Sequence, residues 1–103
     1  MQITLNIDGK EKTYTNDFVK ARIFKNALKL NKEMKSIKEI SEELFDKLVE
    51  FVVVAFDRQF TVDEVWDGLA VADLQSEAMR IFNEVLSLGG LQIESDEGNE
   101  PGK

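Results

Sequence analysis

The sequence predicts a small α+β domain that is mainly helical, with an N-terminal β-hairpin, about four helices and a disordered acidic C-terminal tail. Three observations support this fold class. Polar and apolar residues alternate over residues 2–7, helical spacing dominates from residue 18 to residue 88, and 103 residues suit one domain. Hydrophobic residues make up 43% of the chain, which is enough to line a single core.

The first element is a hairpin over residues 2–15. Ile3, Leu5 and Ile7 alternate with polar residues, which is the period of a half-buried strand. Asp8-Gly9 follows directly, and this dipeptide favours a two-residue turn whose central residues both have positive φ. The return strand is therefore predicted at residues 10–15.

The next element is a helix over about residues 17–33. Thr15, Asn16 and Asp17 can each cap its start, and apolar residues recur at helical spacing from Phe18 onward. Its other side carries four cations spaced by three and four residues: Arg22, Lys25, Lys29 and Lys32. Such a basic stripe is usually a solvated helix face, and the alternative is a docking surface for an acidic partner.

A second helix is predicted over about residues 42–57, capped by Ser41. Its second half, residues 51–56, is apolar all round. This half must be buried in the domain or present an apolar face to another chain. In the second case it could also mediate self-association.

Two further helices complete the domain, which should span residues 1–90. Thr61 and Glu64 fit a capping box that starts a short helix over residues 62–67, with Gly68 as its stop. Trp66 on this helix suits either the core or an interface. The last helix is predicted at residues 70–88 and ends at Gly89-Gly90, and residues 91–103 are expected to form a flexible acidic tail.

Most enzyme chemistry is not expected in this chain. It has no Cys and no His, which removes thiolate and imidazole nucleophiles, acid/base catalysts and metal ligands. No calcium-loop or phosphate-binding glycine pattern occurs, and the acidic clusters at residues 42–46 and 63–67 are explained as anions at helix starts. We assign no catalytic residue, no metal and no cofactor.

The N-terminal residues do not resemble a signal peptide, and the longest run of aliphatic and aromatic residues, 51–56, is far shorter than the roughly 18 residues of a membrane helix. We therefore expect a cytoplasmic protein without a membrane partner.

Charge is distributed unevenly along the chain, whose net charge is −7. Residues 1–38 hold nine basic and four acidic side chains, a balance of +5, and residues 39–103 hold four and sixteen, a balance of −12. Such asymmetry indicates partners more than fold. Direct nucleic-acid binding is not expected from four cations on an acidic chain, but an acidic mimic of DNA that binds a nucleic-acid-binding host protein is an alternative function.

The order of these segments resembles one protein family. The hairpin ITLNIDGKEKTYT, the basic helix, the segment ISEELFDKLVEFVVVAFDRQFTVDEVWDGL and the final IFNEVLSLGG together look like the tail assembly chaperones of long-tailed (siphovirus-type) phages and prophages of Gram-positive bacteria. The resemblance covers about residues 1–90, and its most specific stretch is QFTVDEVWDGL at residues 59–69.

The resemblance implies a protein of the bacterial host's cytoplasm that binds the tape measure protein. It would keep this client soluble while tail tube subunits polymerise, and it would be absent from the finished virion. A longer form made by ribosomal frameshifting would recruit the tail tube protein. Our hypothesis for the partner-binding residues is Phe51, Val54, Phe56, Phe60 and Trp66.

Overall fold

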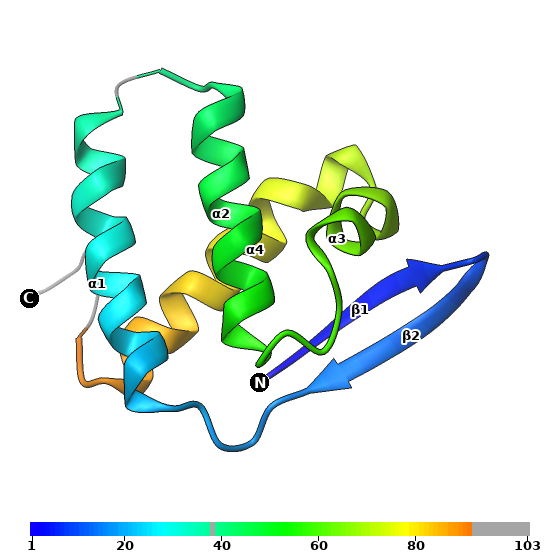
Figure 1. Cartoon of the computed structure of the whole chain (residues 1–103), viewed down its shortest axis with the longest axis horizontal. Coiled ribbons are helices and arrows are strands. Elements are labelled where there is room, and N and C mark those ends of the chain that lie inside the picture. The colour runs from blue at the N-terminus through cyan, green and yellow to red at the C-terminus, as the bar shows by residue number, and fades with distance from the viewer. Residues whose placement is uncertain (38, 92–103) are drawn as a thin grey trace, which may run out of the picture.

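A computed structural model describes residues 1–37 and 39–91 of the chain. Two strands, β1 (Gln2–Ile7) and β2 (Lys10–Thr15), are followed by four helices: α1 (Ala21–Ser36), α2 (Glu42–Ala55), α3 (Val62–Gly68) and α4 (Val71–Leu88) (Figure 1). The predicted hairpin followed by four helices is therefore confirmed.

The hairpin forms as its sequence predicts. β1 and β2 pair antiparallel from Gln2 opposite Thr15 to Ile7 opposite Lys10. Asp8 and Gly9 in the turn have φ values of 54° and 82°, the left-handed conformation that a tight two-residue hairpin requires. Ile3, Leu5 and Tyr14 are buried, so one face of the hairpin joins the core.

α1 begins four residues later than predicted, at Ala21 and not at residue 17. Asn16 does not cap this helix. Its buried side chain donates from Nδ2 to the carbonyl oxygen of Ala55, at 2.8 Å, and accepts from the backbone N–H of Phe18, at 3.1 Å. Because Asn16 is bonded to the end of α2, residues 16–20 form a connection, and Phe18 is 77% exposed.

α2 lies at the centre of the domain and contacts α1, α3 and α4, the last of which crosses behind α1 and α2 in Figure 1. Ser41 caps it as predicted, accepting from the backbone N–H of Leu44. The helix ends at Ala55, two residues earlier than predicted, because Asp57 and Arg58 adopt left-handed φ values of 55° and 57°.

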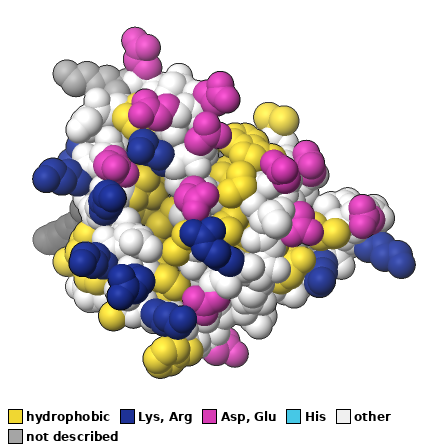
Figure 2. Space-filling view, in the orientation of Figure 1, with side chains coloured by type: hydrophobic (Ala, Val, Ile, Leu, Met, Phe, Trp, Pro, Cys, Tyr) yellow, Lys and Arg dark blue, Asp and Glu magenta, His cyan; other side chains and the backbone are white. Residues whose placement is uncertain are grey.

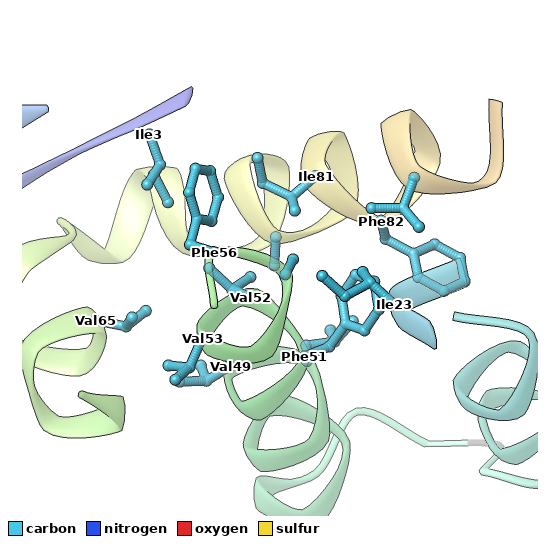
Figure 3. Packing of buried hydrophobic residues seen from close by; sticks show 14 of the residues in the cluster. Ile3, Ile23, Val49, Phe51, Val52, Val53, Phe56, Val65, Ile81 and Phe82 are labelled. Carbon is cyan, nitrogen blue, oxygen red and sulfur yellow. The ribbon is translucent and has the colours of Figure 1, made fainter. Parts of the chain in front are cut away.

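Aromatic side chains from several elements pack around α2 (Figure 3). Phe51 of α2 and Phe82 of α4 meet edge to face, with ring centroids 5.7 Å apart. Phe60, in the loop after α2, lies 4.8 Å from the ring of Tyr14 and 5.6 Å from that of Phe56. The apolar second half of α2 thus forms the core of the domain.

α3 starts with the predicted capping box, since Thr61 accepts from the N–H of Glu64 and Glu64 accepts from the N–H of Thr61. Gly68, however, does not follow the helix but is its last residue. A Cβ atom at Gly68 would lie 3.1 Å from both Asn6 O and Leu5 Cβ. Gly68 therefore lets α3 approach β1 closely, a role that the prediction of a simple stop missed.

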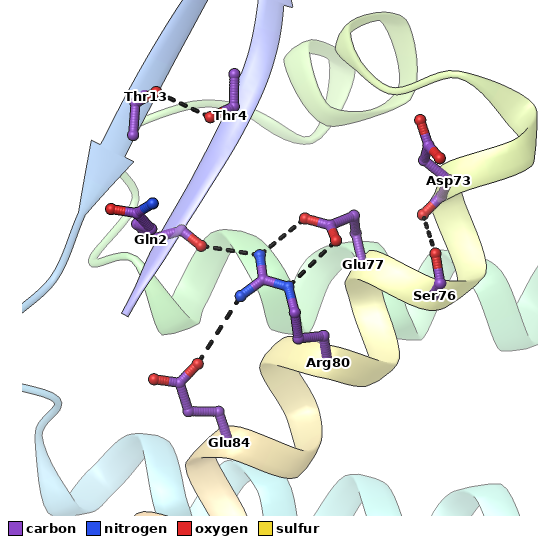
Figure 4. A network of polar contacts seen from close by, with 8 residues as sticks. All are labelled: Gln2, Thr4, Thr13, Asp73, Ser76, Glu77, Arg80 and Glu84. Atoms are coloured by element: carbon purple, nitrogen blue, oxygen red, sulfur yellow. Dashed lines mark hydrogen bonds and ion pairs between the residues drawn. The ribbon is translucent and has the colours of Figure 1, made fainter.

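α4 ends at Gly89-Gly90 as predicted, with Gly90 at a φ of 93°. The Arg80 guanidinium of α4 donates to Gln2 O of β1 at 2.9 Å and to both carboxylate oxygens of Glu77 (Figure 4). This network links the helix to the hairpin. The predicted acidic tail lies, apart from Leu91, outside the described residues.

Candidate binding surface

An open groove of about 440 Å³ runs between α1 and α2, which lie side by side and antiparallel (Figure 1). Its floor is apolar, formed by Leu30 of α1 and by Phe51 and Val54 of α2. Asn26 and Val54 also border a smaller hollow of about 220 Å³ at one end of the groove. The two hollows together form one surface along both helices.

The α1 side of the groove is cationic. The sequence-predicted basic stripe of Arg22, Lys25, Lys29 and Lys32 is exposed along α1. Lys29 lines the groove and Arg22 lines the adjoining hollow. None of the four forms an ion pair with another residue that the structure describes.

The α2 side of the groove is acidic. Glu43, Asp46 and Glu50 follow one another by three and four residues along α2, are exposed, and so share one face of this helix. Figure 2 shows a band of hydrophobic side chains between Lys and Arg side chains over α1 and Asp and Glu side chains over α2. An apolar floor therefore lies between two rows of opposite charge. We call Arg22 and Lys29 of α1 the cationic bank, and Asp46 and Glu50 of α2 the acidic bank.

Three ion pairs border this surface. Lys47 Nζ lies 3.8 Å from Glu33 Oε1 across the groove, Arg58 pairs with Glu50 at 3.3 Å, and Lys20 pairs with Asp57 at 3.7 Å. All six side chains are at least one-third exposed, so each pair contributes at most about 1 kcal/mol and can be exchanged for a partner's charge at little cost.

Three of the five residues predicted to contact a partner are buried in the domain. Phe51, Phe56 and Phe60 are only 5%, 0% and 3% exposed, because the domain is too small to leave the apolar end of α2 outside its core. Phe56 and Phe60 therefore lie away from the groove, whereas Phe51 lines it with the small part of its side chain that stays exposed.

The other two contact residues remain at the surface. Val54 is half-buried in the groove, and Trp66 on α3 is 37% exposed. The structure brings Val54 together with the basic stripe but provides no contact between Trp66 and the groove lining.

Sequence reasoning missed several surface features. Leu30 and Asn26 line the groove, and Ile40 and Val71 are exposed apolar side chains. The spacing of Asn26, Leu30 and Glu33 on α1 places them on one face, but which helix faces them depends on tertiary packing.

Glu77 and Arg80 form a charged pair on α4. Hydrogen bonds from Arg80 lower the pKa of the Glu77 carboxyl, and the same bonds raise the pKa of the Arg80 guanidinium. This pair links α4 to β1 and lies in no pocket described above. Among residues 1–37 and 39–91, no three or more Asp or Glu side chains are grouped so that they could hold a metal ion.

No helix within the described ranges is long and apolar enough to cross a membrane.

Comparison with known proteins identifies one family. A family model described as phage tail chaperone protein matches residues 1–103. No curated protein and no solved structure matches the chain. The family match covers the whole chain, so the chain belongs to the phage tail chaperone family.

Proposed function

We propose that this member of the phage tail chaperone family binds the tape measure protein and keeps it soluble while tail tube subunits polymerise around it. The proposal extends to long-tailed (siphovirus-type) phages or prophages of Gram-positive bacteria, with the chaperone acting in the host cytoplasm and absent from the finished virion. The family match over the whole chain supports the assembly role, and we propose that this role consists of binding and not of catalysis.

The surface of the protein supports client binding. A holdase needs accessible apolar surface for the client and charge that keeps the loaded complex in solution. The half-buried Val54 in the groove between α1 and α2 offers the first, and the net charge of −7 offers the second. Trp66 on α3 is a second proposed contact.

Further partners belong to the same proposal. The tail tube protein would be recruited by a longer, frameshifted form of the chain, and the exposed apolar side chains would allow self-association. Comparing the masses of the chaperone forms made in infected cells tests the first idea. Sedimentation of the purified chain at several concentrations tests the second.

Co-expression with the tape measure protein tests the main proposal. We expect the tape measure protein to be soluble with the chaperone and to aggregate without it, and we expect purified virions to lack the chaperone. A tape measure protein that is equally soluble in both cultures would contradict the proposal.

The alternative function, an acidic DNA mimic, gains no support from the face that carries the groove. A mimic presents carboxylates at phosphate-like spacing on one face, and the one face drawn in Figure 2 is not of this kind, since it carries Lys and Arg side chains beside Asp and Glu. Salt separates the two ideas, because mimic binding weakens steeply with ionic strength and binding led by apolar burial persists.

A further inference from the structure

We propose that the groove between α1 and α2 binds one amphipathic helix with oppositely charged borders, and that the charges of the two banks set the direction of this helix. The inference rests on the proposed function, since the bound helix would belong to the tape measure protein. It adds the place, the chemistry and the orientation of binding.

The dimensions and the floor of the groove suit a helix. Its α1 side extends over residues 22–33, which corresponds to about 16 Å or three helical turns. The half-buried Val54, with the small exposed parts of Leu30 and Phe51 beside it, provides apolar contact for residues that recur every three or four positions on a partner helix. About three turns of helix would therefore cover the floor.

The banks select the charges of the bound helix. Acidic residues on one border of that helix would face Arg22 and Lys29 of the cationic bank, and basic residues on its other border would face Asp46 and Glu50. The exceptions are Glu33 on the α1 side and Lys47 on the α2 side. They lie 3.8 Å apart and neutralise each other, so the polarity of the banks is preserved.

The same charges fix the direction of the helix. An apolar floor accepts a helix lying either way along the groove. Turning the helix end for end while its apolar stripe stays on the floor exchanges its two borders, and each border then meets charges of its own sign. Like charges in contact disfavour this second orientation, so only one direction is stable for a given helix.

Charge complementarity also favours this occupant over the chain's own C-terminal segment. Residues 92–103 carry four carboxylates (Glu94, Asp96, Glu97 and Glu100) and one basic residue, Lys103. They could complement the cationic bank but offer only one cation to the acidic bank.

The probe for the test is a synthetic helical peptide with a Leu stripe, Glu along one border and Lys along the other. The first variant of the full chain is Arg22→Glu with Lys29→Glu, and the second is Asp46→Lys with Glu50→Lys. We expect each variant to bind the labelled peptide about tenfold more weakly. The variant with all four changes should recover wild-type affinity, because the peptide can turn end for end.

The recovery distinguishes a directional groove from general attraction to a charged surface, because the four changes leave the net charge as it is. All four residues are exposed, so the variants should remain folded, as circular dichroism would verify. Equal affinity of all variants, or a fourfold variant as weak as the weaker double variant, would overturn the proposal.

Two other occupants of the groove, the C-terminal segment and a second copy of the chain, are tested in the same way. Neutralising Glu94, Asp96, Glu97 and Glu100 in the full chain should leave peptide affinity within about threefold of wild type, since exposed charges interact weakly. A gain of tenfold or more would overturn the proposal in favour of the C-terminal segment. A chain that sediments as a dimer, and as a monomer after Val54→Arg, would overturn it in favour of a second copy.

Binding of the tape measure protein separates failure of this inference from failure of the proposed function. We expect Val54→Arg to weaken this binding about tenfold or more, and the matched control Val71→Arg, on a 95% exposed residue outside the groove, to leave it unchanged. If both variants bind the tape measure protein like wild type, the groove is not its binding site, and the proposed function stands. If wild type does not bind, the proposed function fails.

Discussion

Asn16 is the residue on which the connection between the hairpin and α1 depends. Its amide is buried and bonds to Ala55 O and to the N–H of Phe18. The sequence suggests only a local cap, because Ala55 is 39 residues away and nothing in the residue order shows that the two will meet. A polar side chain of this kind can be assigned only once its long-range partner is known.

Replacing Asn16 by Ala should lower the free energy of unfolding by about 1–3 kcal/mol, since it leaves a buried carbonyl oxygen without its donor. Urea denaturation measures the change. Asn83→Ala, at an exposed position on α4, is the matched control and should change stability by less than about 1 kcal/mol. Equal stability of the two variants would show that the Asn16 bond is unimportant.

Gly68 is a second residue whose role depends on tertiary packing. An Ala at the end of a helix would normally stabilise it by up to about 1 kcal/mol relative to Gly. Here the added Cβ would press on Asn6 O and Leu5 Cβ at 3.1 Å, so α3 and β1 would have to separate. We expect Gly68→Ala to destabilise the domain by about 1 kcal/mol in thermal unfolding, and a stabilised variant would exclude the close approach.

Glu77 makes a pH-dependent contribution to the free energy of unfolding. Hydrogen bonds from Arg80 lower its pKa in the folded protein, so its stabilisation is present above the pKa of the unfolded chain and is lost as pH falls through the folded pKa. Because the pair is partly exposed, the effect should be well below about 1 kcal/mol.

Glu77→Gln should therefore lower stability at neutral pH but not at strongly acidic pH. Urea denaturation at several pH values measures this, with the exposed Glu11→Gln as control. A constant difference between Glu77→Gln and wild type across the pH range would contradict the assigned cause.

At the scale of elements, local signals predicted the number, type and order of strands and helices. The Asp8-Gly9 turn, the Ser41 cap and the Thr61–Glu64 capping box all form as expected, since each depends on residues within a few positions of one another. The start of α1 and the end of α2 differ from prediction, because the Asn16 bond and the left-handed loop after α2 set them, and α1 also continues to Ser36, three residues beyond its predicted end.

The capping box offers a test at this scale. Thr61→Ala should lower stability by about 1 kcal/mol, because the N–H of Glu64 loses its acceptor at the start of α3. A cycle with Glu64→Ala should show that the two changes are not additive, since each residue bonds to the other's backbone. Strict additivity in urea denaturation would indicate that the two bonds act independently.

At the scale of the whole molecule, the sequence predicts charge and apolar content but not where they meet. The basic stripe on α1 was recognisable from spacing, and its acidic counterpart on α2 could be explained as a helix-start feature. Only the antiparallel packing of α1 against α2 turns the two into opposite banks of one apolar groove. The same packing moved Phe51, Phe56 and Phe60 into the core.

The central claim is that this chain binds the tape measure protein, and affinity purification of that protein tests it most directly. The tape measure protein carries the tag, and the untagged chain is co-expressed with it. The resin that holds the tagged protein is washed with high salt before elution. We expect the chain to stay bound at high salt, because apolar contact dominates. We expect less of the Val54→Arg variant to be eluted with the tape measure protein. Soluble tape measure protein that is eluted with no chaperone bound to it would contradict the claim.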